Sequence, residues 1–157
     1  MTIIYAIDPG NIESAWVTLR DGIPVDHGKV ENDEMLSTVR TAFVPGNLLA
    51  IEMIASYGMP VGREVFDTCL WIGRFQEAFI ARGGAVELVY RKDVKLFHCG
   101  SLRASDANIR AALLDRFGPG RVRAVGTKGS PGPLYGIVSD QWSALAIATT
   151  IDGRIDL

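Results

Sequence analysis

The start of the chain alternates apolar and polar positions in a way that predicts three strands. Residues 2–7 form an apolar run that ends at the turn sequence Asp8-Pro9-Gly10, which is typical of a buried strand. Residues 14–19 place small or apolar side chains at alternate positions, and Arg20-Asp21-Gly22 then provides a hairpin turn. Residues 23–30 predict the third strand. We therefore expect the chain to begin with an antiparallel meander.

The rest of the chain alternates helical and strand patterns. Apolar residues at three- and four-residue spacing predict helices from an N-cap at Asn32 to a stop at residues 45–47, over residues 62–82, from an N-cap at Ser105 to Phe117, and over residues 138–151. Short apolar runs at residues 48–54 and 86–90 predict two more strands. Residues 118–136, with six glycines and three prolines, predict a mobile or extended loop. This order predicts an α/β fold with a single five-stranded mixed sheet, its first three strands antiparallel, and helices on both faces.

Composition adds limits to this picture. A chain of 157 residues that is 48% hydrophobic suits one domain, residues 1–157, with an ordinary core. We expect a cytoplasmic protein without a membrane partner, because no apolar run approaches the ~20 residues that span a bilayer and no basic leader is present. Cys69 and Cys99 have neither metal-ligand spacing nor a disulfide framework, so reduced thiols are expected. No small-molecule cofactor is expected.

Charge is distributed unevenly along the chain. The net charge of −2 argues mildly against nucleic-acid binding. However, residues 1–61 hold eight acids against three bases, whereas residues 91–128 hold nine bases against three acids. A basic segment of this kind can bind a polyanion locally, although for any single one of its charges a solvated surface position is the simpler interpretation.

Three carboxylates are candidates for chemistry. Asp8 lies at the exit of the first strand, Glu52 interrupts the apolar run at residues 48–54, and Asp140 falls in the first turn of the last helix. Taken alone, Asp8 also fits a simple turn and Asp140 also fits an N-cap. Glu52 is harder to explain structurally, because a buried carboxylate is costly unless it is paired or binds a metal ion.

The predicted topology brings these carboxylates together. If the first and fourth strands pair in parallel, Asp8 and Glu52 lie side by side, and a helix packed across that edge can add Asp140. Clustered carboxylates repel one another, and Mg²⁺ relieves this repulsion because it prefers oxygen ligands. Two such ions ~4 Å apart suit phosphodiester hydrolysis.

Several segments resemble the RuvC-like Holliday junction resolvases. The likeness covers nearly the whole chain and is carried by the ordered set Ile7-Asp8-Pro9-Gly10, Ala50-Ile51-Glu52 and Asp140-Gln141-Trp142-Ser143-Ala144-Leu145-Ala146-Ile147-Ala148. Four further segments resemble phage and prophage members: Trp71-Ile72-Gly73-Arg74-Phe75, Val94-Lys95-Leu96, Asp106-Ala107-Asn108-Ile109-Arg110 and Pro131-Gly132-Pro133-Leu134-Tyr135-Gly136.

The resemblance implies an RNase H-like fold, a homodimer and structure-selective cleavage of four-way DNA junctions in recombination or phage DNA processing. It implies that Asp8, Glu52 and Asp140 are catalytic ligands of two Mg²⁺ ions, with Mn²⁺ able to substitute. One departure is Ser143, which stands where many cellular resolvases have a second acid on the last helix. The expected phosphate contacts come from the basic segment: Arg91, Lys92, Lys95, Arg103, Arg121, Arg123 and Lys128.

The helix predicted at residues 62–82 is apolar on more than one side, which favours more than one packing partner. We expect the dimer interface on this helix, at Phe66, Leu70, Trp71 and Phe75, although an aromatic-rich helix can also pack entirely inside a monomer.

Three other functions remain open. Another RNase H-like nuclease, acting on flaps or other branched DNA, would share the carboxylates. A non-catalytic junction-binding protein would explain Ser143. An actin-like ATPase also opens with Ile-Asp-x-Gly, but it needs two lobes and further phosphate-binding loops that 157 residues hardly accommodate.

Overall fold

One five-stranded sheet forms the centre of the protein, in a computed structural model that describes residues 1–155. Its strands are β1 (Ile3–Asp8), β2 (Glu13–Arg20), β3 (Ile23–Glu31), β4 (Leu48–Met53) and β5 (Ala85–Tyr90). They lie in the order β3-β2-β1-β4-β5, with β1–β2 and β2–β3 antiparallel and β1–β4 and β4–β5 parallel. The predicted mixed sheet, with its first three strands antiparallel, is confirmed.

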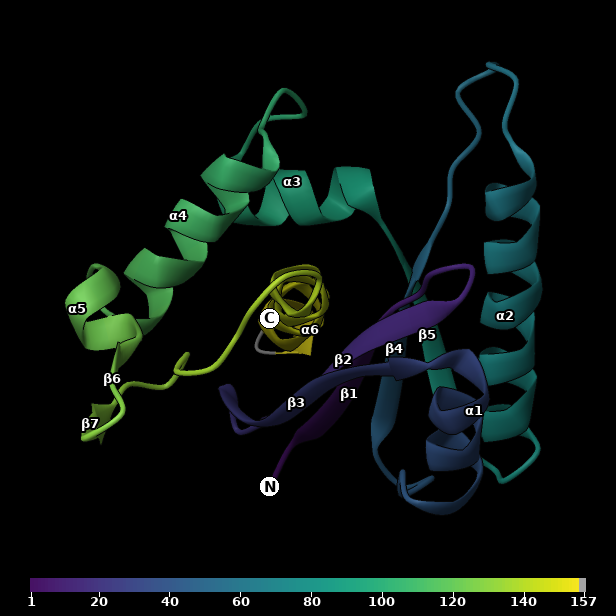
Figure 1. Cartoon of the computed structure of the whole chain (residues 1–157), viewed down its shortest axis with the longest axis horizontal. Helices are drawn as coiled ribbons and strands as arrows, with labels where there is room; N and C mark the ends of the chain where they lie inside the picture. The colour runs from purple at the N-terminus through teal and green to yellow at the C-terminus, as the bar shows by residue number, and fades with distance from the viewer. Residues whose placement is uncertain (156–157) are drawn as a thin grey trace.

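Helices cover both faces of this sheet (Figure 1). On one face lie α1 (Asn32–Thr41) and α2 (Arg63–Ile80), which also pack against each other. On the other face α6 (Gln141–Ile155) contacts β1 and β2 directly. The helices α3 (Arg91–Cys99) and α4 (Asp106–Phe117) pack against α6 in turn, so α6 is enclosed on nearly every side.

The period-two alternation of the strands divides the core into two halves. Ile4 and Ala6 of β1 face α6, whereas Tyr5 and Ile7 face α1 and α2. The same parity places Asp8, which follows Ile7, on the face that α6 covers. This alternation decides which side of the sheet carries the candidate site.

The segment after β5 is a helix, which the sequence did not predict. Val94 is the one fully buried residue of α3, and the apolar side chains of Leu96 and Phe97 are exposed. The Asp93 carboxylate accepts a hydrogen bond from the Tyr90 backbone N–H at 3.3 Å at the helix start, and Gly100 ends the helix with a φ of 67°. With nine residues and one buried side chain, α3 is too short for its apolar spacing to stand out in the sequence.

Residues 118–136 are more ordered than predicted. They contain the short helix α5 (Arg121–Ala124) and a small hairpin of β6 (Gly126–Thr127) and β7 (Ser130–Pro131). Ala124 and Leu134 are fully buried, and the Leu134 N–H donates to the Ala124 carbonyl at 2.8 Å. Glycine at position 132 is required because any side chain there would overlap the Ala124 carbonyl.

Two helix starts can be compared with their predicted caps. Ser105 caps α4 as predicted, with its Oγ accepting from the Asn108 N–H at 3.2 Å. Asn32 was predicted as an N-cap but is the first residue of α1, after Glu31. Its buried side chain instead contacts the loop after β1. Within residues 1–155, no helix has the length and apolarity needed to cross a bilayer.

Candidate metal and DNA site

Asp8 and Glu52 meet at the carboxyl ends of two adjacent parallel strands. The β1–β4 register pairs Ile7 with Ile51, so the next residues along the two strands are neighbours on the α6 face. Their carboxyl groups share a hydrogen bond. The predicted juxtaposition of these two residues is therefore present.

Their surroundings favour the uncharged acids. Burial, followed by the charges of Glu52 and Asp140, raises the pKa of Asp8 to about 8. Burial also raises the pKa of Glu52, while the Arg91 guanidinium partly offsets that effect. The hydrogen bond between the two carboxyl groups requires a proton, and the raised pKa of both acids is consistent with the pair sharing one.

A buried network fixes the turn that follows Asp8. The Ser14 hydroxyl donates to Asn32 Oδ1 at 2.6 Å, and Asn32 Nδ2 donates to the Gly10 carbonyl at 2.8 Å. The Gly10 N–H donates to Ser14 Oγ at 3.3 Å. Because β2 and α1 both hold this turn, the end of β1 that carries Asp8 has a defined position.

Asp140 lies directly before α6 and is exposed. Its Oδ2 accepts from Lys29 Nζ of β3 at 2.7 Å, which directs the carboxylate toward β3. It remains close enough to help raise the pKa of Asp8. In residues 1–155, no three acidic, histidine or cysteine side chains converge as a preformed metal cluster. The structure thus brings two of the three predicted ligands together and places the third next to them, paired with Lys29.

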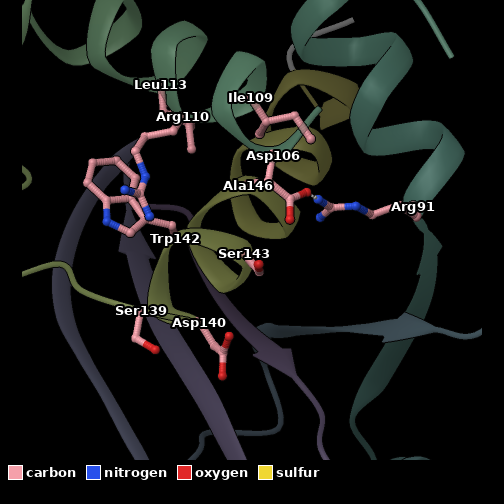
Figure 2. Close-up of a pocket in the computed structure, with 10 residues that line it drawn as sticks. All are labelled: Arg91, Asp106, Ile109, Arg110, Leu113, Ser139, Asp140, Trp142, Ser143 and Ala146. Atoms are coloured by element: carbon pink, nitrogen blue, oxygen red, sulfur yellow. Dashed lines mark ion pairs between the residues drawn. The ribbon is translucent and has the colours of Figure 1, made fainter. Parts of the chain in front are cut away.

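The start of α6 forms one wall of a pocket of about 260 Å³ (Figure 2). Asp140, directly before α6, and Ser143 of α6 line it, and Asp106 lines it from the start of α4. Arg91, the first residue of α3, forms an ion pair with Asp106 across the pocket (Figure 2). Arg91 therefore lies between Asp106 and the Asp8–Glu52 pair. Its positive charge partly offsets the rise in the pKa of both acids.

A second groove, of about 580 Å³, adjoins Glu52 on the β5 side. Arg91, Lys92 and Lys95 of α3 line it together with Tyr57 and Leu102. Three of the seven predicted phosphate contacts thus lie beside the acids. A groove with cationic and apolar walls suits a polyanion that also carries flat apolar groups.

The other predicted phosphate contacts lie apart from this groove. Arg103 is exposed between α3 and α4. Arg121, Arg123 and Lys128 are exposed on α5 and the β6–β7 hairpin, beyond the end of α4 (Figure 1). Because α4 has 12 residues, its two ends are about 18 Å apart. The basic segment therefore forms two groups along the α4 side.

The predicted interface residues of α2 differ in exposure. Phe66 and Leu70 are 62% and 68% exposed, and Trp71 is half-buried. Phe75 is fully buried in the core between the sheet and α1–α2, in contrast to the prediction that it contacts a second subunit. Its helical position turns it inward, toward the same side as Phe79.

Three residues of the site were not predicted. Lys29 contacts Asp140, and the Arg110 guanidinium lies 4.9 Å from the centre of the Trp142 ring in the pocket of Figure 2. Arg110 and Trp142 come from different helices, so helical spacing alone could not pair them. The register between β2 and β3 decides where Lys29 points, and the sequence alone did not give that register.

The donor set fits hard divalent cations. Asp8 and Glu52 offer adjacent carboxylate oxygens whose mutual repulsion a cation would relieve, and Asp140 offers a third group at the same edge. No sulfur or imidazole ligand accompanies them in the described chain, and oxygen-only sites favour Mg²⁺ or Mn²⁺ over Zn²⁺.

Comparison with known proteins places the fold. No protein-family model matches the sequence, and no curated protein matches it. Two solved structures match almost end to end, each covering 99% of this chain and 97% of its own. The first is the Thermus thermophilus RuvC structure, with a TM-score of 0.68 and 17% sequence identity. The second is T. thermophilus RuvC in complex with Holliday junction substrate, with a TM-score of 0.70 and 16% sequence identity. The predicted RNase H-like, RuvC-like fold is confirmed.

Proposed function

We propose that the protein is a divalent-metal-dependent endonuclease that cuts four-way DNA junctions in recombination or phage DNA processing. The observation that carries the proposal is the hydrogen-bonded Asp8–Glu52 pair at adjacent strand ends, with Asp140 at the start of the helix that crosses them. Costly buried acids at one sheet edge are typical of a metal site. The similar fold of a protein solved with a Holliday junction substrate supports branched DNA as the ligand.

In this proposal Asp8, Glu52 and Asp140 hold two Mg²⁺ ions, and Mn²⁺ can substitute. When bound at these carboxylates, such ions would supply activation of the attacking water and stabilisation of the leaving oxygen of the phosphodiester. The chain itself supplies two of these ligands from central strands and the third from the residue directly before α6. Arg91, Lys92 and Lys95 bind the phosphates that flank the scissile bond and orient the strand in the groove beside Glu52.

Because residue 143 is a serine, the site has one negative charge fewer than a site with a fourth acid at this position. The Ser143 hydroxyl lines the pocket with Asp140, one helical turn along α6. A neutral oxygen holds Mg²⁺ more weakly than a carboxylate, so Ser143 would contribute less to holding a second ion than an acid at that position. The same observation favours the second candidate function, a junction-binding protein without cleavage.

A homodimer completes the proposal. A four-way junction has two equivalent strands to cut, which suits a two-fold symmetric protein. Phe66 and Leu70 expose large apolar side chains on the outer side of α2, and half-buried Trp71 adjoins them. We assign the interface to these three residues and exclude Phe75, whose side chain is enclosed in the core.

Cleavage of synthetic DNA tests the proposal. A labelled four-way junction, a flap and a linear duplex of the same sequence are incubated with Mg²⁺, with Mn²⁺ and with EDTA. We expect paired cuts in the junction with either metal and none with EDTA. Preferential cleavage of the flap would indicate a different RNase H-like nuclease. Tight junction binding without cleavage in any metal would support the non-catalytic alternative.

A further inference from the structure

Lys29 belongs to the same row of side chains as the two paired acids. The β1–β2 register pairs Asp8 with Ala15, and the β2–β3 register pairs Ala15 with Lys29. Directly paired residues point to the same face of a sheet, so Lys29 and Asp8 both lie on the α6 face. With strands ~4.8 Å apart, their Cα atoms are about 10 Å apart, within reach of a lysine side chain.

The Lys29 ammonium forms ion pairs with two carboxylates, those of Asp140 and Glu13. It donates to Asp140 Oδ2 at 2.7 Å and lies 3.9 Å from Glu13 Oε2. The hydrogen bond to Asp140 raises the pKa of Lys29 further above its usual value, so the group stays charged. Asp140 is therefore held by a cation of the chain itself while Asp8 and Glu52 pair with each other.

A separate contact fixes the backbone around Asp140. His27 Nδ1 lies 2.7 Å from Gln141 Oε1, and the same oxygen accepts from the Val138 N–H at 3.4 Å. Gln141 is buried, so this contact anchors the start of α6 to β3 without Lys29. The interaction with Lys29 thus determines the direction of the Asp140 side chain and is not needed to hold the helix.

We propose that Lys29 is a positioning residue that competes with a divalent metal for Asp140. While Lys29 holds the carboxylate, Asp140 is withheld from the Asp8–Glu52 pair; Asp140 leaves Lys29 when it becomes a metal ligand. Lys29 therefore lowers the metal affinity of the DNA-free protein. This inference rests on the proposed metal site, and it adds a residue that the metal ligands themselves do not include.

Mn²⁺ binding to the DNA-free protein, followed by electron paramagnetic resonance of the free ion, tests the competition without any cleavage assay. Lys29→Met and Lys29→Gln should bind Mn²⁺ about three- to tenfold more tightly than the wild type, because a competing cation is removed. Lys29→Arg keeps the ion pair and should bind Mn²⁺ like the wild type. Lys92→Met, which removes a charge near Glu52 but leaves Asp140 and its partners intact, controls for charge and should have a smaller effect.

A double-mutant cycle separates withholding from simple charge repulsion. In an Asp140→Asn background, Lys29→Met should give little gain, since the residue it releases is no longer a carboxylate. An equal gain in both backgrounds, or no gain in Lys29→Met and Lys29→Gln, would overturn the competition. If Asp8→Asn weakens Mn²⁺ binding but the Lys29 variants leave the Mn²⁺ affinity unchanged, only this inference fails. If the wild type binds no Mn²⁺, or Asp8→Asn binds it equally well, the proposed metal site fails as well.

Discussion

The carboxyl groups of Asp8 and Glu52 share a hydrogen bond across the boundary between β1 and β4, and burial with two neighbouring charges raises the pKa of Asp8 to about 8. The folded protein therefore holds this proton more tightly than the unfolded chain, in which the pKa is near 3.8. The sign of the linkage follows: ionisation of Asp8 destabilises the fold as pH rises from about 4 to about 8.

Asp8→Asn should consequently stabilise the metal-free protein, and more strongly at pH 8 than at pH 5. An uncharged amide at this position removes the cost of ionising a buried acid, a gain of roughly 1–2 kcal/mol at pH 8. Thermal unfolding in EDTA at the two pH values measures the difference. Asp115→Asn, at an exposed position of α4, is the matched control. The same gain at both pH values would contradict the raised pKa.

The proposed ligands should be essential for cleavage and dispensable for binding. Asp8→Asn, Glu52→Gln and Asp140→Asn each remove one negative charge from the metal site, and each should slow cleavage roughly 10²-fold or more. Junction affinity measured in Ca²⁺ should change little, because none of the three contacts phosphate directly. Asp115→Asn should cleave normally. Wild-type cleavage by any one of the three variants would remove that residue from the ligand set.

The paired acids were predictable from the sequence because two simple rules define them. Residues of a strand alternate between faces, and parallel neighbours bring their carboxyl ends to one edge. Glu52 stood out as the single charge in an apolar run. Asp140 was predicted in the first turn of a helix over residues 138–151, whereas α6 begins one residue after it, at Gln141. None of these steps needed side-chain geometry.

Lys29 could not be placed in the same way, because its face depends on an irregularity in the β2–β3 hairpin. Counted from the turn, where Arg20 pairs with Ile23, a regular hairpin would set Gly28 opposite Ala15. The register shifts between Thr18 and Leu19, and Lys29 takes that place instead. A one-residue shift moves a side chain to the other face of a sheet.

The ordered hairpin within residues 118–136 was missed because its few buried side chains give a far weaker pattern than its glycines.

DNA binding should depend on the groove beside Glu52. Lys92→Ala and Lys95→Ala should each weaken junction binding and reduce the log–log salt slope by about 0.9 for each phosphate that is no longer neutralised. Fluorescence anisotropy across a salt series measures both quantities. Arg20→Ala is the control, because Arg20 pairs with Ile3 at the opposite end of β1 from Asp8. An unchanged slope in both lysine variants would place the DNA elsewhere.

Dimerisation should depend on the outer side of α2. Phe66→Asp or Leu70→Asp places a charge where an apolar contact is proposed, and each variant should sediment as a monomer at micromolar concentration. Val122→Asp, at an even more exposed position on α5 far from α2 in Figure 1, should remain a dimer. A wild-type monomer that still makes paired cuts would refute the interface.

His98 should make stability depend on pH near neutrality, in the opposite direction to Asp8. Its Nε2 lies 3.1 Å from the Ala146 carbonyl and 2.9 Å from Thr149 Oγ1, between α3 and α6. Burial lowers the pKa of His98 below its usual value of 6.5, so the folded state favours the neutral ring. Stability from this group is full above pH 6.5 and is lost as pH falls through that value, because the unfolded chain then binds a proton more readily.

His98→Gln keeps a hydrogen-bond donor at this position and removes the titration. The free energy of unfolding of the wild type should therefore fall relative to His98→Gln between pH 7.5 and 5.5, by up to roughly 1 kcal/mol. Urea unfolding at several pH values gives the difference, and imidazole ¹⁵N shifts report the charge of His98 directly. A difference between the two proteins that stays constant with pH, or an imidazolium signal from His98 at pH 6.5, would show that the ring is not held neutral by the packing of α3 against α6.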